Sequence, residues 1–105
     1  MGRWQPRVRG GLEVTFKRVD DNQKQVVKAL RHEGMTVQHL HAVGKGCPDL
    51  LVGWKGKNIL LEIKDGVKSW KLTPDQVIWH FLWQGQVAVV TSPESAVQEV
   101  KDAIK

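Results

Sequence analysis

Residues 48–64 of the chain read PDLLVGWKGKNILLEIK and have the pattern of a β-hairpin. Two apolar runs flank the dipeptide Lys55-Gly56, which can form a two-residue turn, although it is a weaker turn signal than Asn-Gly. With this turn Trp54 pairs with Lys57, and the same register extended outward places Asp49 opposite Glu62. A bulge or a three-residue turn would shift the register by one position and separate the two acids.

The second strand of this hairpin has two different faces. Side chains alternate across a strand, so Ile59, Leu61 and Ile63 share one face and Glu62 and Lys64 share the other. The first set has the character of core. The second set puts an acid and a base side by side.

Asp49, Glu62 and Lys64 together predict a site for phosphodiester hydrolysis. Side chains directly opposite in a hairpin have Cβ atoms about 5 Å apart. Carboxylates that close repel each other and stay ionised together only around a cation. Carboxylate oxygens and waters suit Mg²⁺, which can polarise a phosphoryl oxygen and acidify a bound water. The lysine can orient that water or neutralise developing charge.

A plainer interpretation of the same residues is a polar sheet face with a Glu–Lys pair. An Asp followed by Glu-x-Lys after this interval also arises by chance. Pro48 directly before Asp49, the glycines before that proline and the matching register favour the catalytic interpretation.

The elements before the hairpin are less sharply patterned. Residues 12–17 alternate apolar and polar side chains, which permits a short strand. Asp20 or Asp21 can cap a first helix, which Gly34 ends. Residues 35–43 are then predicted as a strand.

The elements after the hairpin are well punctuated. Thr73-Pro74-Asp75-Gln76 has the residues of a capping box with proline at the first helical position, and the helix should run to about residue 83. Residues 87–90 are predicted as a buried strand, and Ser92 caps a last helix. The order is helix, three strands, helix, strand, helix, which predicts an α/β fold with a mixed central sheet flanked by helices.

Length and composition exclude several protein classes. The 105 residues form one domain, and 41% apolar and 26% charged residues are ordinary for a globular protein. No apolar run is long enough for a bilayer, and arginines interrupt the N-terminal region where a signal peptide would be apolar, so we expect no membrane partner and a cytoplasmic location. The single Cys47 excludes an internal disulfide and a cysteine-based zinc site.

The positive charge is concentrated in the first residues. The formal net charge is +5, and residues 1–18 hold five basic residues against Glu13 alone. We therefore divide the chain into a basic N-terminal arm, residues 1–19, and a domain, residues 20–105. Such an arm suits a polyanion, most often nucleic acid, but a solvated tail that aids solubility explains it equally well.

Two stretches together resemble a known nuclease superfamily. GKGCPDLLVG at residues 44–53 followed by LLEIKDG at residues 60–66 resembles the PD-(D/E)XK superfamily. LTPDQ at residues 72–76, with Trp79-His80, is more specifically similar to its VRR-NUC branch, particularly the stand-alone phage-type members. The resemblance covers roughly residues 20–100 and implies a restriction-endonuclease-like α/β core.

The resemblance also implies a set of site residues. Mg²⁺ or Mn²⁺ would be bound by Asp49, Glu62 and the backbone carbonyl of Ile63, with Lys64 on the attacking water. The conserved glutamine of the family corresponds to Gln76, although its place in the capping box explains that residue without catalysis, and both roles stay open.

One position departs from the family pattern. Many members carry a glutamate in the first helix that completes the metal site, and this chain offers Gln23 as the equivalent position. A neutral side chain there would weaken metal affinity.

Several basic and aromatic residues are candidates for DNA contact: Lys45, Lys68, Trp70, Lys71, Arg7 and Arg9. Trp70 lies between basic residues just after the catalytic strand, where it could stack on a base. Lys45 precedes Asp49 in a glycine-rich turn, where a solvated lysine is an equal alternative. Trp79 and Trp83, four residues apart on a helix, are expected in the core or at an oligomer contact.

The function expected from these observations is a divalent-metal-dependent DNA endonuclease. The family pattern implies a 5′-phosphate product, a homodimer and a branched substrate such as a Holliday junction. Binding through backbone phosphates would be strongly salt-sensitive. A non-catalytic nucleic-acid-binding module with the same fold is the alternative, and a nuclease of repair or restriction would share the chemistry.

Overall fold

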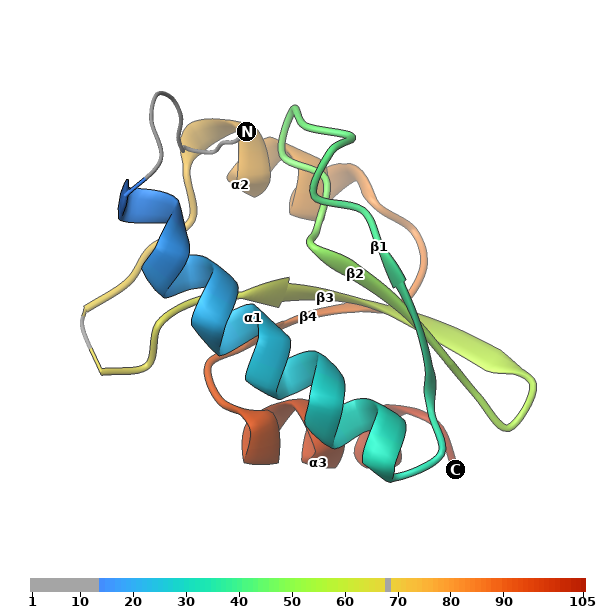
Figure 1. Ribbon diagram of the computed structural model, residues 1–105. Coiled ribbons are helices and arrows are strands. Elements are labelled where there is room, and N and C mark those ends of the chain that lie inside the picture. The colour runs from blue at the N-terminus through green and yellow to red at the C-terminus, as the bar shows by residue number, and fades with distance from the viewer. Residues whose placement is uncertain (1–13, 68) are drawn as a thin grey trace.

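The computed structural model describes residues 14–67 and 69–105 (Figure 1). Within this range, helices and strands follow one another in the predicted order. They are α1 (Val14–His32), β1 (Thr36–His39), β2 (Leu50–Trp54), β3 (Lys57–Ile63), α2 (Pro74–Leu82), β4 (Val87–Val90) and α3 (Pro93–Ala103).

The strands form one mixed sheet in the order β1-β2-β3-β4. β1, β2 and β3 are antiparallel neighbours, whereas β4 runs parallel to β3. A parallel pair needs a crossover connection, and the segment that contains α2 provides it. The predicted α/β class, with a mixed central sheet flanked by helices, is confirmed.

The β2–β3 hairpin has the predicted two-residue turn and register. Lys55 and Gly56 both have positive φ, 53° and 77°, as a turn that matches the right-handed strand twist requires. Trp54 pairs with Lys57 and Leu50 with Leu61. The Lys55 ammonium lies 4.4 Å from the centre of the Trp54 ring, and this cation–π contact helps to offset the cost of a left-handed lysine.

The core lies between one face of the sheet and two helices. α1 and α3 pack against each other and on the sheet, whereas α2 lies apart from both (Figure 1). The alternate residues of β3 predicted as core are buried there. The members of the core are Val26, Val27, Leu30, Met35, Leu50, Val52, Ile59, Leu61, Ile63, Val90, Ala96, Val100 and Ile104.

The N-terminal part of the prediction is wrong in two respects. Residues 14–17 belong to α1 and not to a strand, and the helix starts at Val14, well before Asp20. The boundary drawn after residue 19 therefore falls inside a helix. Three apolar residues in alternation do not distinguish a strand from a helix end, and a stable helix extends upstream because each added residue gains a hydrogen bond.

β1 is shorter than the strand predicted over residues 35–43. The Leu40 amide donates to the Asp49 carbonyl at 2.8 Å, and the Val43 amide then donates to the Leu40 carbonyl at 2.9 Å. The chain therefore turns away from the sheet after β1, opposite the residue that precedes β2 in the chain. Pro48, which has no amide hydrogen, cannot extend the ladder.

Helix α2 begins as predicted but is unusual in its exposure. Thr73 caps it, Pro74 occupies the first turn, and Gln76 completes the capping box. No residue of α2 is buried, although most are apolar, and Phe81 is 84% exposed. Trp79 and Trp83 are therefore not core residues. Among the described residues, no helix has the length and apolarity to cross a bilayer.

Candidate active site

The two acids of the hairpin lie side by side, as predicted. The paired register ends at Leu50 and Leu61, and Asp49 and Glu62 are the next residues outward. Their carboxyl groups lie within hydrogen-bonding reach of each other. Glu62 is only 3% exposed and Asp49 is half-buried. The Ile63 amide donates to Asp49 Oδ2 at 2.8 Å, which aims the aspartate along the edge of β3. The fold therefore brings the two carboxyl groups together at the open end of the hairpin.

Burial and mutual repulsion oppose the ionised form of these acids. Burial raises the pKa of Glu62 to about 10, the charge of Asp49 adds to the rise, and Lys64 opposes it. Burial also raises the pKa of Asp49, against the hydrogen bond from the Ile63 amide. Without a cation, the pair therefore keeps a proton at neutral pH.

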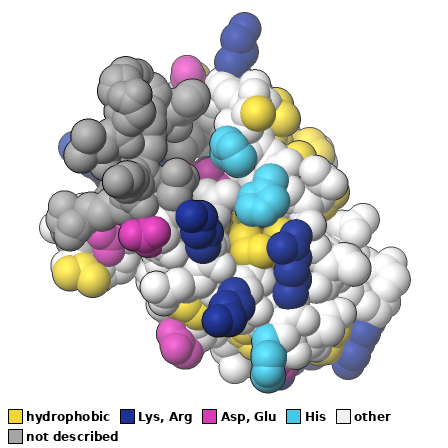
Figure 2. Space-filling model, in the orientation of Figure 1, with side chains coloured by type: hydrophobic (Ala, Val, Ile, Leu, Met, Phe, Trp, Pro, Cys, Tyr) yellow, Lys and Arg dark blue, Asp and Glu magenta, His cyan; other side chains and the backbone are white. Residues whose placement is uncertain are grey.

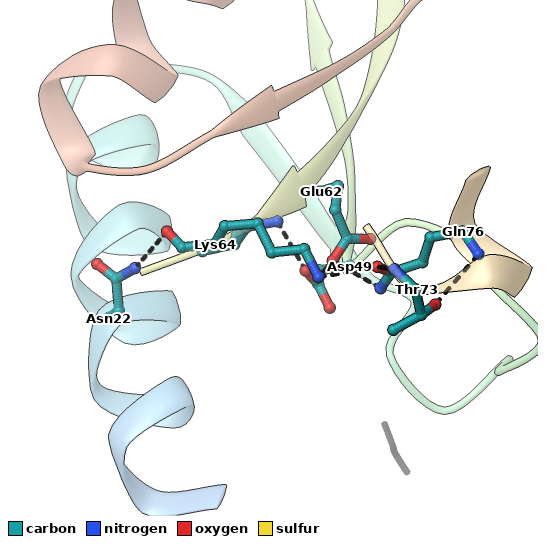
Figure 3. A network of polar contacts seen from close by, with 7 residues as sticks. Asn22, Asp49, Glu62, Lys64, Thr73 and Gln76 are labelled. Atoms are coloured by element: carbon teal, nitrogen blue, oxygen red, sulfur yellow. Dashed lines mark hydrogen bonds and ion pairs between the residues drawn. The ribbon is translucent and has the colours of Figure 1, made fainter. Parts of the chain in front are cut away.

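Lys64 and Gln76 join the acids in one network (Figure 3). The Lys64 ammonium lies 3.8 Å from Glu62 Oε2 and donates to Gln76 Oε1 at 2.8 Å. Gln76 Nε2 in turn donates to Glu62 Oε2 at 3.1 Å. We call Asp49, Glu62, Lys64 and Gln76 the polar cluster. Glu62 lies in β3 and Lys64 directly follows it, Asp49 directly precedes β2, and Gln76 lies in α2.

Gln76 takes part in the helix cap and also bonds to the other residues of the polar cluster. Its Oε1 accepts from the Thr73 amide at 3.0 Å, and its own amide donates to Thr73 Oγ1 at 3.2 Å, which is the capping box. The same Oε1 accepts from Lys64. One side chain therefore starts the helix and holds the cluster lysine.

The loop before Asp49 fixes α2 in place. Gly46 has φ +87°, and a Cβ built there would lie 2.4 Å from the Asp75 carbonyl oxygen. Only glycine allows this close approach of two backbones. Because Asp75 precedes Gln76, the contact holds the start of α2 against the polar cluster.

Gln23, the first-helix position considered from the sequence, contacts a histidine. Its side chain is buried but pairs with Nδ1 of His39 at 3.2 Å, with no hydrogen bond to the polar cluster among the described residues. The side chain of the neighbouring Asn22 donates instead to the backbone carbonyl of Lys64, at 3.3 Å.

Two histidines near the cluster were not predicted as site residues. The positive field of His41 lowers the pKa of Asp49, which places it near the acids, and its ring meets that of His39 edge-on. His80 is half-buried, and burial and the charge of Lys64 lower its pKa. Its spacing of four residues from Gln76 on α2, and its place in the stretch that carries the family resemblance, were the signals in the sequence.

The residues present fit a hard divalent cation. Glu62 Oε1 is buried and has no hydrogen-bond partner among the described residues, which is costly unless another group binds it. The Ile63 carbonyl points to the same side of β3 as its amide, toward Asp49, since a strand residue pairs through both groups on one side. Two carboxylates, a carbonyl and waters form a Mg²⁺ or Mn²⁺ donor set. No group of three or more His, Cys, Asp and Glu ligands occurs in residues 14–67 and 69–105.

Cys47 is unsuited to act as a nucleophile. Burial, with the charges of Glu62 and Asp49, raises the pKa of its thiol. A protonated thiol is a poor nucleophile.

The predicted DNA-contact residues are only partly described. Lys45 is exposed in a left-handed turn position with φ 54°, and Trp70 and Lys71 are exposed in the loop after β3. Arg7, Arg9 and Lys68 lie outside the described residues. The face that carries α1 shows several Lys, Arg and His side chains near its centre (Figure 2).

No protein-family model, no curated protein and no solved structure matches this chain.

Proposed function

We propose that the chain is a divalent-metal-dependent DNA endonuclease that hydrolyses phosphodiester bonds. The observation that carries this proposal is the contact between Asp49 and Glu62 with the Lys64 ammonium 3.8 Å from Glu62. Burying two adjacent acids is costly for stability, and a site that acts on a phosphoryl group is a reason to retain them. The resemblance of residues 44–66 to the PD-(D/E)XK superfamily supports the same proposal.

Asp49, Glu62 and the Ile63 carbonyl would hold Mg²⁺ or Mn²⁺, which when bound supplies a Lewis acid and an acidified water. Lys64 presents a positive charge to the phosphoryl group and a donor to the attacking water. Gln76 fixes the Lys64 ammonium through its Oε1, at 2.8 Å. Because the helix cap immobilises Gln76, little reorganisation is needed when substrate arrives.

The substrate proposed is DNA, and branched DNA in particular, cut by a homodimer. A homodimer would present two polar clusters to the two strands of a junction. The exposed apolar residues of α2 support self-association, because a surface helix without a buried face needs a partner. The basic side chains on the α1 face suit the phosphate backbone.

The alternative is a nucleic-acid-binding module that has lost catalysis. The observation that favours it is Gln23, which contributes no carboxylate and pairs with His39. Against it, a module that only binds DNA has no need of two buried acids beside its ligand.

Cleavage of plasmid, linear, flap and four-way-junction DNA, each with Mg²⁺, Mn²⁺ or EDTA, tests the proposal. We expect cleavage with either metal and none in EDTA. Asp49→Asn, Glu62→Gln and Lys64→Met should each reduce the rate at least about 100-fold. Asp102→Asn, on the distant α3, is the matched control and should keep full activity. Metal-independent binding by the wild type without cleavage would leave the binding module as the function.

A further inference from the structure

A small cavity lies next to the polar cluster but is not part of it. Its volume is about 300 Å³, and its lining is mostly apolar. One wall is Lys45, and the others come from one flank and the end of α2: Asp75, Ile78, Trp79, Leu82 and Trp83. We call it the Lys45–Trp83 cavity. None of these side chains has a role in the chemistry proposed above.

The cavity and the polar cluster share two short segments of backbone. Lys45 is followed by Gly46, whose backbone rests on that of Asp75. Asp75 is followed by Gln76, which hydrogen-bonds to Glu62 and Lys64. A strand whose phosphate lies at the acids therefore has its neighbouring nucleotide within reach of the cavity.

The chemistry of the walls suits a flat aromatic ring that carries an anion. Trp79 and Trp83 are stacked, with ring centres 4.7 Å apart and planes 19° from parallel. Trp83 remains 46% exposed, so its ring is open to a further partner. Aromatic side chains of this kind stack on bases of any sequence. Lys45 provides the positive charge, and the Asp75 carboxylate can accept from an amino group of a base.

The occupant argued for is nucleic acid and not a second copy of the chain. The volume is at the small end of ligand sites, which is too small for a protein segment of several residues and fits one planar group. Val77 and Phe81 are exposed and do not line the cavity, and helical spacing puts them on the other flank of α2, as a separate apolar surface. Charge also favours nucleic acid, since the exposed Lys45 complements a phosphate.

We propose that the Lys45–Trp83 cavity binds an unpaired nucleobase next to the scissile phosphate, with the adjoining phosphate facing Lys45. This inference rests on the proposed nuclease function for the position of the phosphate. It makes the substrate class DNA with an unpaired nucleotide beside the cut, as at a branch, flap or bulge.

The test is equilibrium binding of the full chain, with Ca²⁺ in place of Mg²⁺, to two labelled duplexes. One carries a single unpaired adenosine, and the other has an abasic sugar at the same position. We expect the wild type to bind the first roughly 5- to 100-fold more tightly. Trp83→Ala and Lys45→Ala should weaken binding to the adenosine duplex, and Trp83→Ala should bring the ratio close to one.

Phe81→Ala is the matched control, because Phe81 is an exposed aromatic residue of the same helix that does not line the cavity. It should keep the wild-type ratio, whatever it does to overall affinity. Light scattering of each variant reports its mass. A Trp83→Ala protein that changes its mass and keeps the ratio would show that a second copy fills the cavity, which overturns the inference.

The outcomes separate the two proposals. If the wild type binds both duplexes equally and still cleaves DNA with metal, the base-binding role of the cavity is overturned and the nuclease proposal stands. A ratio well above one in a protein that cuts no DNA overturns the nuclease and leaves the base-binding cavity. Failure to bind either duplex overturns both.

Discussion

Glu62 makes the stability of the metal-free protein depend on pH. Its pKa rises from an ordinary 4.5 to about 10 in the folded chain. The folded state therefore keeps a proton that the unfolded state releases above pH 4.5, so stability is full below that pH and declines as pH rises toward about 10. The slope for one proton is at most about 1.4 kcal/mol per pH unit.

Urea unfolding between pH 5 and pH 9 in EDTA measures this slope. We expect the free energy of unfolding to fall with pH in the wild type and to change much less in Glu62→Gln. Glu94→Gln, which changes an exposed acid, is the control and should follow the wild type. Equal slopes in all three proteins would show that Glu62 ionises normally in the fold.

Gln76 allows the capping and the site roles to be separated by one substitution. Glutamate serves in a capping box as well as glutamine does, so Gln76→Glu should leave the free energy of unfolding within about 1 kcal/mol of the wild type. It removes the donor to Glu62, however, and adds a third negative charge beside Lys64. We expect a loss of cleavage of roughly 10- to 100-fold. A Gln76→Glu protein that is clearly less stable but cleaves DNA at the wild-type rate would contradict this assignment of roles.

At the scale of elements, the hairpin was predictable and its surroundings were less so. The period of two and a two-residue turn define the register locally, so Asp49 and Glu62 could be paired from sequence alone. The start of α1 and the end of β1 depend on tertiary partners. Nothing in the sequence around Leu40 shows that the hydrogen bonds between β1 and β2 end with the one from Leu40 to Asp49.

The contact between the Gly46 loop and α2 is the element-scale feature most open to test. A Cβ at residue 46 would meet the Asp75 backbone, and φ +87° is strained for alanine. We expect Gly46→Ala to lower the free energy of unfolding by about 1–3 kcal/mol and to reduce cleavage by displacing Gln76. Gly44→Ala is the control, because its φ is also positive while a Cβ there meets nothing within 4 Å. Equal losses in both variants would assign the effect to backbone strain alone.

At the scale of the whole molecule, α2 is an apolar helix on the outside. Phe81 is 84% exposed. If α2 is the contact between two copies, Phe81→Asp should convert a dimer of the wild type into a monomer, as measured by light scattering of the eluted protein. Val67→Asp changes another highly exposed apolar residue, in the loop after β3, and should leave the mass unchanged. A wild type that is monomeric at high concentration would contradict the dimer.

The polar cluster shows where sequence reasoning ends at this scale. Asp49, Glu62 and Lys64 belong to one hairpin, and local geometry brings them together. Gln76 joins them across a crossover, and only the resemblance to a known family indicated it. Asn22 and His41 approach through the packing of α1 and β1, which no spacing in the chain encodes.

The side-chain oxygen of Gln76 couples the folding of α2 to the position of the Lys64 ammonium. The first turn of α2 cannot unwind without moving the Gln76 oxygen that accepts from both the Thr73 amide and the Lys64 ammonium. Local fraying of a short exposed helix would therefore act as an off state for the whole centre. A ligand that favours the ordered lysine would tighten the helix in return, since such coupling is reciprocal.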